Sequence, residues 1–107
     1  MIEVVVKTSA VSGQPHIAQI TMQGHAGSGE YGKDLVCAAA SALIITFVNS
    51  VETLCGRDMA PEVRSGYLDV TLRAEQREQL LAQSLLVGLE GMMRDHGAYI
   101  MIRRIAI

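Results

Sequence analysis

The sequence predicts an α+β domain of two layers, with two helices packed against a small, mostly antiparallel sheet of four strands. Three observations support this fold class. Short segments alternate apolar with polar residues, as half-buried strands do. Two segments of about 20 residues are apolar at helical spacing. The patterns follow one another in the order β-β-α-β-α-β within 107 residues, so residues 1–107 are expected to form a single domain.

Four segments are expected to be strands. Residues 2–8 are rich in Val and Ile, and residues 16–24 alternate apolar with polar side chains after a turn, which favours a hairpin. Residues 66–72 alternate in the same way, and residues 99–107 are expected to be the last strand. The intervening residues 57–65 are expected to be a polar connection without regular structure.

Two segments are expected to be helices. Residues 34–54 begin at Asp34, a suitable N-cap, and stop before Gly56; residues 74–95 stop before Gly97. The first helix has almost no polar face, which indicates that it is covered on more than one side. A small sheet and one other helix cannot wrap it fully, so a partner subunit is expected.

Composition argues against several functional classes. Nine Lys and Arg residues against eleven Asp and Glu give a net charge of −2, which provides little attraction for nucleic acid. The N-terminal segment has an acidic residue at position 3 and no basic region before its apolar run, so it is expected to be a strand rather than a signal peptide. The apolar stretch 35–51 contains Ser, Thr and Asn and is short for a bilayer crossing. We therefore expect a cytoplasmic protein that binds neither membrane nor nucleic acid.

The chain has two cysteines: Cys37 lies in the first turn of the first predicted helix, and Cys55 follows its last residue directly. Their separation along that helix is roughly 27 Å, too far for a disulfide between them. Neither belongs to a CxxC pair, so no metal site is expected, and no motif calls for a cofactor.

Residues 27–33 match the first seven positions of the phosphate-binding pattern GxxxxGK[ST]. The eighth position is Asp34, whose carboxylate would repel the phosphates and replace the hydroxyl that binds magnesium. A nucleotide site is therefore set aside.

A thiol site is the second interpretation of this stretch. Cys37 falls in the first turn of the predicted helix, where the helix end favours a thiolate and unpaired N–H groups can bind an oxyanion. His25 ends the second strand, and the loop with Gly27, Gly29 and Gly32 is long enough to fold back and act as a lid. A small core cysteine and a solvent-exposed histidine remain the alternative from spacing alone. Ser41 lies one turn after Cys37.

The motif also resembles a known family. Gly24-His25-Ala26, then Tyr31-Gly32, then the run from Asp34 to Ala39 followed by Ser41, resemble the ribosomal-processing cysteine protease Prp family. The resemblance implies that Cys37 is the nucleophile, that His25 is its partner and that Asp34 and Ser41 support them. It further implies a homodimer that removes an N-terminal extension from a large-subunit ribosomal protein. Cleavage after an aromatic residue implies an apolar pocket, to which residues 57–65 are candidates to contribute.

A second function from another class remains open at this point. The chain could be a non-catalytic, ribosome-associated module whose glycine-rich loop clasps a peptide or a phosphate. Replacement of Cys37 by alanine separates the two, because only the protease would lose an activity.

Overall fold

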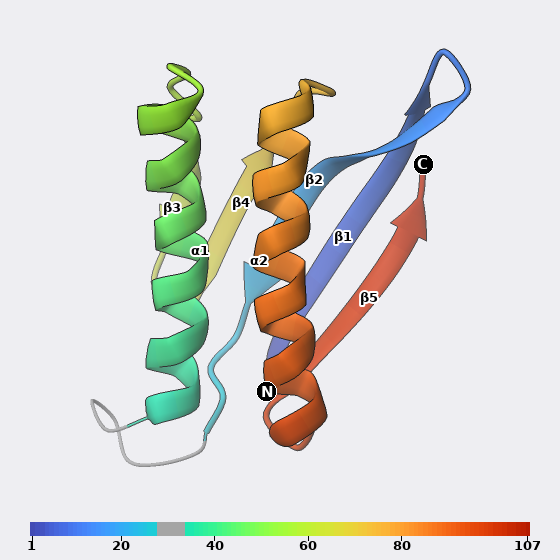
Figure 1. Ribbon diagram of the computed structural model, residues 1–107. Helices are drawn as coiled ribbons and strands as arrows, with labels where there is room; N and C mark the ends of the chain where they lie inside the picture. The colour runs from blue at the N-terminus through green and yellow to red at the C-terminus, as the bar shows by residue number, and fades with distance from the viewer. Residues whose placement is uncertain (28–33) are drawn as a thin grey trace.

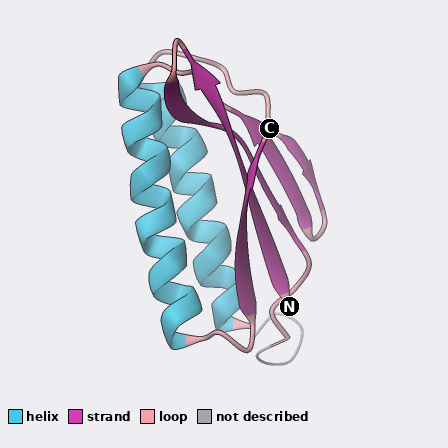
Figure 2. Ribbon diagram, turned by 90° about the vertical axis from the view of Figure 1, so that its right-hand side faces the viewer, coloured by secondary structure: helices cyan, strands magenta, loops and turns pink. Residues whose placement is uncertain are grey.

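The computed structural model describes residues 1–27 and 34–107, so Gly29 and Gly32 of the expected loop lie outside the described residues. The chain forms seven elements in sequence order: β1 (Ile2–Val11), β2 (Gln14–Gln23), α1 (Leu35–Leu54), β3 (Glu62–Arg64), β4 (Tyr67–Thr71), α2 (Gln76–Asp95) and β5 (Ile100–Ala106). The two helices lie side by side and antiparallel (Figure 1). Both cover the same face of one twisted sheet (Figure 2).

The predicted α+β class with two helices is confirmed, but the predicted sheet of four strands is wrong. The sheet has five strands in the order β3-β4-β2-β1-β5 and is mixed. The extra strand, β3, lies in the stretch expected to be a connection, residues 57–65. It has only three residues, all exposed, so it carries no alternation of apolar and polar side chains that the sequence could reveal.

The mixed character of the sheet follows from the path of the chain. Strand β4 pairs antiparallel with β2, and β2 pairs antiparallel with β1, so β4 and β1 point the same way. Helix α2 then returns the chain to the end where β4 began, and β5 pairs parallel with β1. A helical crossover of this kind is what a parallel pairing requires.

One core lies between the sheet and the helices. Alternate residues of β1 point into it, and the register sets Val4 beside Met22 and Val6 beside Ile20 on the same face. Both helices add buried residues from one side only. Those of α1 are Val36, Ala40, Ile44, Phe47, Val48 and Val51, and the apolar ones of α2 are Ala82, Leu85, Leu86 and Leu89.

Helix α1 begins as the sequence predicts, with Asp34 as its N-cap. Its outer side remains uncovered in this single chain: Leu35 is 80%, Ile45 53% and Leu54 64% exposed. By length and composition alone α1 would also qualify as a membrane-spanning helix. Its six buried residues instead pack in the same core as those of the sheet and α2.

Helix α2 begins at Gln76 rather than at residue 74. The residue that caps it is Glu75, whose carboxylate accepts hydrogen bonds from the N–H groups of Arg77 and Glu78. Glutamate is not among the residues that usually cap helices, so its position in the sequence does not mark the helix start.

Candidate active site

The structure brings His25 and Cys37 together. His25 comes two residues after the end of β2, and Cys37 is the third residue of α1. The Nδ1 atom of His25 lies 3.9 Å from the Sγ atom of Cys37. The imidazole is exposed and the thiol is partly buried, so the pair faces solvent at the end of the sheet where α1 starts.

Asp34 explains why the two segments meet. One carboxylate oxygen, Oδ1, accepts the N–H of Cys37 at 3.0 Å as the helix cap. The other, Oδ2, accepts the N–H of Gly27 at 2.8 Å. The carboxylate therefore joins the residue before the undescribed stretch to the first turn of α1. These contacts make Asp34 both a helix cap and a clamp on the chain that carries His25.

The position of His25 also depends on Gly24. The backbone of Gly24 has φ +92°, and a Cβ atom there would lie 2.4 Å from the carbonyl oxygen of Met1. Only glycine allows this close approach, which directs the chain out of β2 and toward α1. The N–H of Gly24 donates to the carbonyl of Gly66 in the β3–β4 turn at 2.8 Å.

A cavity of about 250 Å³ adjoins the pair. One wall is α1, from Cys37 through Ser41 to Asn49, and the opposite wall is the β3–β4 hairpin. The lining is mainly apolar; its apolar side chains are Ile2, Met22, Ile44, Ile45, Val48, Pro61, Val63 and Leu68. Part of the expected connection, residues 57–65, thus lines the cavity, although as a strand.

The first turn of α1 has four backbone N–H groups, and two of them are available to bind a ligand. The N–H groups of Cys37 and Ala38 are bonded to the side chain and the carbonyl of Asp34. Within the described residues, those of Leu35 and Val36 have no hydrogen-bond acceptor. Unpaired N–H groups in a first helical turn attract a negative charge such as an oxyanion.

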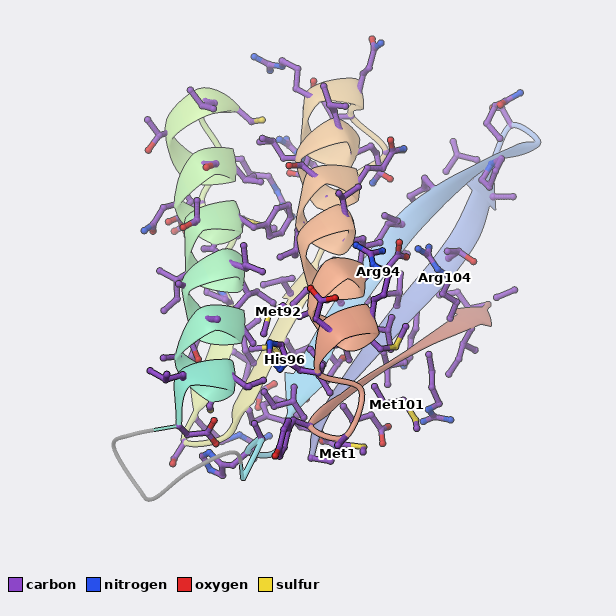
Figure 3. The ribbon with its side chains drawn as sticks, turned by 60° about the horizontal axis from the view of Figure 1, so that its bottom comes forward. Met1, Met92, Arg94, His96, Met101 and Arg104 are labelled. Carbon is purple, nitrogen blue, oxygen red and sulfur yellow. The ribbon has the colours of Figure 1, made fainter. Side chains whose placement is uncertain are left out.

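The other histidines and the second cysteine lie elsewhere. His96 is the C-cap of α2 (Figure 3), and neither it nor His16 lines the cavity. Cys55 is the C-cap of α1, at the opposite end of that helix from Cys37. Among the described residues, no group of three or more His, Cys, Asp or Glu side chains could hold a metal ion.

Sequence reasoning missed the hairpin side of the site. Gly66, Tyr67 and Arg64 all line the cavity, and the Arg64 guanidinium stacks 4.2 Å above the Tyr67 ring. The dipeptide Ser65-Gly66 is a turn signal that would have predicted a hairpin here if residues 62–64 had been considered as a strand. Nothing in the sequence indicates that this hairpin lies opposite α1.

Comparison with known proteins decides the family. The sequence profile of the cysteine protease Prp family matches residues 1–101. The chain belongs to this family. The ribosomal processing cysteine protease Prp of Bacillus subtilis (strain 168) is 33% identical over 104 residues, which cover 90% of each chain. That of Staphylococcus aureus (strain Mu50 / ATCC 700699) is 30% identical over 90 residues, covering 80% of this chain and 85% of the relative.

Solved structures show the same fold. The protein SMU.848 from Streptococcus mutans matches with a TM-score of 0.83 and 27% identity, over 100% of this chain and 96% of that one. The essential ribosomal processing protease Prp from S. aureus, in complex with a covalently linked product peptide, matches with a TM-score of 0.77 and 26% identity, over 94% and 98%. The chain is thus a cysteine protease, and the family and enzyme class expected from the motif are confirmed.

Proposed function

We propose that Cys37 and His25 are the catalytic pair with which this protease removes an N-terminal extension from a large-subunit ribosomal protein. The observation that carries the proposal is the 3.9 Å approach of the thiol to the imidazole beside an apolar cavity. A thiol with a base within reach is the arrangement that nucleophilic attack on a carbonyl needs.

The chemistry proceeds in two halves. Sγ of Cys37 gives its proton to Nδ1 of His25 and attacks the carbonyl carbon of the scissile peptide bond. The bond to nitrogen breaks as the imidazolium returns the proton to the leaving amine, and a thioester to Cys37 remains. Water, deprotonated by the imidazole, then hydrolyses the thioester and restores the thiol.

The start of α1 provides the charge stabilisation that this chemistry requires. Negative charge develops on the carbonyl oxygen in both halves of the reaction. We assign its stabilisation to the N–H groups of Leu35 and Val36, because Asp34 already occupies those of Cys37 and Ala38. Asp34 and Ser41 are supporting residues in this proposal: the first fixes the helix start, and the second lines the cavity one turn beyond Cys37.

The substrate assignment rests on the relatives and on the cavity. The relatives are ribosomal processing proteases, and one S. aureus structure holds a substrate peptide. The cavity lies between a helix and a hairpin and is mainly apolar. Such a lining suits an aromatic side chain next to the scissile bond. Ribosomal proteins are made in the cytoplasm, and we assign the protein to that compartment.

Substitution of Cys37 provides the test. In Cys37→Ala, cleavage of a peptide that spans the extension should fall by ~1000-fold or more, because the thiol beside His25 that forms the thioester is removed. The matched control is Cys55→Ala, which removes the thiol at the other end of the same helix and should cleave normally. Unimpaired cleavage by folded Cys37→Ala would show that Cys37 is not the nucleophile and would overturn the proposal.

The uncovered face of α1 supports a second part of the proposal, that the protein is a homodimer. From Leu35 to Val51 this helix carries no charged side chain, and its outer side is exposed in the single chain. Sedimentation at micromolar concentration should therefore show a dimer. Ala42→Glu, which adds a charge at an exposed site on α1, should weaken it, whereas Val87→Glu on the exposed side of α2 should not. A monomeric parent protein would contradict this part of the proposal.

A further inference from the structure

The imidazole of His25 lies between Cys37 on one side and the β3–β4 turn on the other. Its Nδ1 atom faces the Sγ atom of Cys37 at 3.9 Å. Its Nε2 atom faces Gly66: a Cβ atom built on Gly66 would lie 2.8 Å from Nε2 and 3.4 Å from Cδ2 and Cε1. The first distance is too short for real side-chain packing, so the ring occupies the space that a side chain at residue 66 would need.

The same glycine fastens the chain that carries the imidazole. Its carbonyl accepts the N–H of Gly24, the residue directly before His25, at 2.8 Å. Its backbone has φ +68°, a conformation that glycine adopts without strain. Gly66 therefore contacts this segment twice, by the hydrogen bond to the backbone of Gly24 and by its position next to the His25 ring.

Within the part of the chain that the structure describes, the His25 ring has no third group that orients it by a hydrogen bond. A base is commonly oriented by a third group that holds its other ring nitrogen. In residues 1–27 and 34–107, no hydrogen bond to Nε2 of His25 is present, and the side chain is exposed. Among the described residues, packing against the bare backbone of the β3–β4 turn is then a contact that limits how far the ring can turn away from Cys37.

We infer that Gly66 is a positioning residue for the reaction: the absence of a side chain there sets the place of the His25 imidazole beside Cys37. The inference rests on the proposed roles of His25 and Cys37. It also links base and substrate, because the hairpin that supports the ring supplies the cavity wall through Val63 and Tyr67.

The test compares two glycines that share a backbone conformation. Gly66→Ala adds a Cβ against His25, whereas Gly56→Ala adds one at φ +64° with no atom within 4 Å. Because the exposed ring can rotate away, both variants should lose similar stability, seen as equal shifts of the urea midpoint. Only Gly66→Ala should lose activity, with kcat lower by ~10- to 100-fold and KM little changed.

A second pair of variants separates the effect on His25 from the effect of backbone strain. Asparagine tolerates positive φ better than alanine but still carries a Cβ. Gly66→Asn should therefore reproduce the loss of kcat with a smaller loss of stability, and Gly56→Asn should behave like the parent. Equal kcat in the Gly66 and Gly56 variants would overturn the inference.

Combination with His25→Ala shows whether Gly66 acts through the imidazole. The readout is the rate at which iodoacetamide alkylates Cys37 in a Cys55→Ala background, which requires no proteolysis. Gly66→Ala should slow alkylation several-fold when His25 is present and leave it unchanged when His25 is alanine. An equal effect in both backgrounds would overturn the inference. If His25→Ala instead cleaves the peptide normally, the proposed function fails, and the alkylation rates still decide the positioning role.

Discussion

The two ends of helix α1 differ in how their charged and polar side chains are bonded. At its C-terminal end, beside the start of α2, Glu78 has no exposed surface. Its carboxylate accepts from the Arg57 guanidinium at 3.0 Å and from the N–H of Arg73, and the Arg73 side chain lies 3.6 Å away. At the N-terminal end, His25 and Cys37 lie 3.9 Å apart and face a solvent-accessible cavity.

At the C-terminal end of α1 the polar groups stabilise the fold, whereas at the N-terminal end they are available for a reaction. A buried carboxylate is tolerated only when its oxygens are fully bonded, and Glu78 meets this condition by joining the residues before β3, the end of β4 and the start of α2. The proposed catalytic pair is held through its backbone, by contacts with Asp34, Gly24 and Gly66, so the polar atoms of its side chains remain available to a substrate. The bonds of Glu78 therefore stabilise the fold, whereas the side chains of Cys37 and His25 can still bond to a substrate.

The largest expected effect on stability comes from removing the Glu78 carboxylate at the C-terminal end of α1. Glu78→Ala should lower the free energy of unfolding by about 3 kcal/mol, because the Arg73 N–H loses its acceptor and the partly buried Arg57 guanidinium loses its carboxylate partner, keeping the Thr71 carbonyl. Urea denaturation measures this loss. Well below the melting temperature, kcat should remain close to that of the parent, since the site lies at the other end of α1.

The matched control for Glu78 is Glu90, which pairs with Arg104 on the surface. Both side chains of that pair are exposed by about two fifths or more, so Glu90→Ala should cost less than ~1 kcal/mol. A larger loss from Glu90 than from Glu78 would contradict the distinction between the two ends. A large fall in kcat for folded Glu78→Ala would show that the ends are coupled.

Asp34 sharpens the comparison, because it serves stability and chemistry at once. Asp34→Ala should lower the free energy of unfolding by about 1 kcal/mol through loss of the helix cap. It should also reduce kcat by ~10-fold or more, since the chain carrying His25 loses its bond to the start of α1. Measurement of unfolding and of peptide cleavage on the same protein separates the two effects.

Two further variants divide the roles of Asp34. Asp34→Asn keeps one oxygen to accept the Cys37 N–H but loses the second acceptor, so it should preserve most of the stability and still lose activity. Asp58→Ala removes a similar carboxylate-to-backbone bond, to the N–H of Ala60 in an exposed loop, and should leave kcat unchanged. Full activity in Asp34→Asn would show that catalysis does not need the bond between Asp34 and the Gly27 N–H.

The same contrast explains what the sequence could and could not predict. The N-terminal end of α1 was predicted correctly because its signals are local: Asp34 marks the helix start, and the glycines around His25 mark a chain that can turn back. The role of Gly66 depends on a contact with a residue 41 positions earlier, and no local pattern reports it.

Long-range contacts also account for the errors in the sheet. Strand β3 exists only because β4 is present to pair with it, and β5 is parallel to β1 because α2 returns the chain to the far edge. Glu78 looks like an ordinary surface residue of a helix, since its burial arises from the Arg57 and Arg73 side chains that reach it from outside α2. The α+β class and the candidate site residues follow from local pattern, whereas the sheet order and the packing around His25 follow from tertiary contacts.

The smallest expected effect concerns Glu75, the N-cap of α2, which lies near the C-terminal end of α1. The hydrogen bond from the Arg77 side chain at 2.8 Å, followed by that from the Glu78 N–H, lowers the pKa of Glu75 from 4.5 to about 2. Because the pKa is lower in the folded protein, the carboxylate stabilises the fold above pH 4.5, and this contribution is lost as the pH falls toward 2. The difference in urea midpoint between the parent and Glu75→Gln should therefore shrink steadily over that interval. An NMR titration of Glu75 with a midpoint near 4.5 would contradict the assignment, and Arg77→Gln should move the midpoint upward because it removes the main cause of the shift.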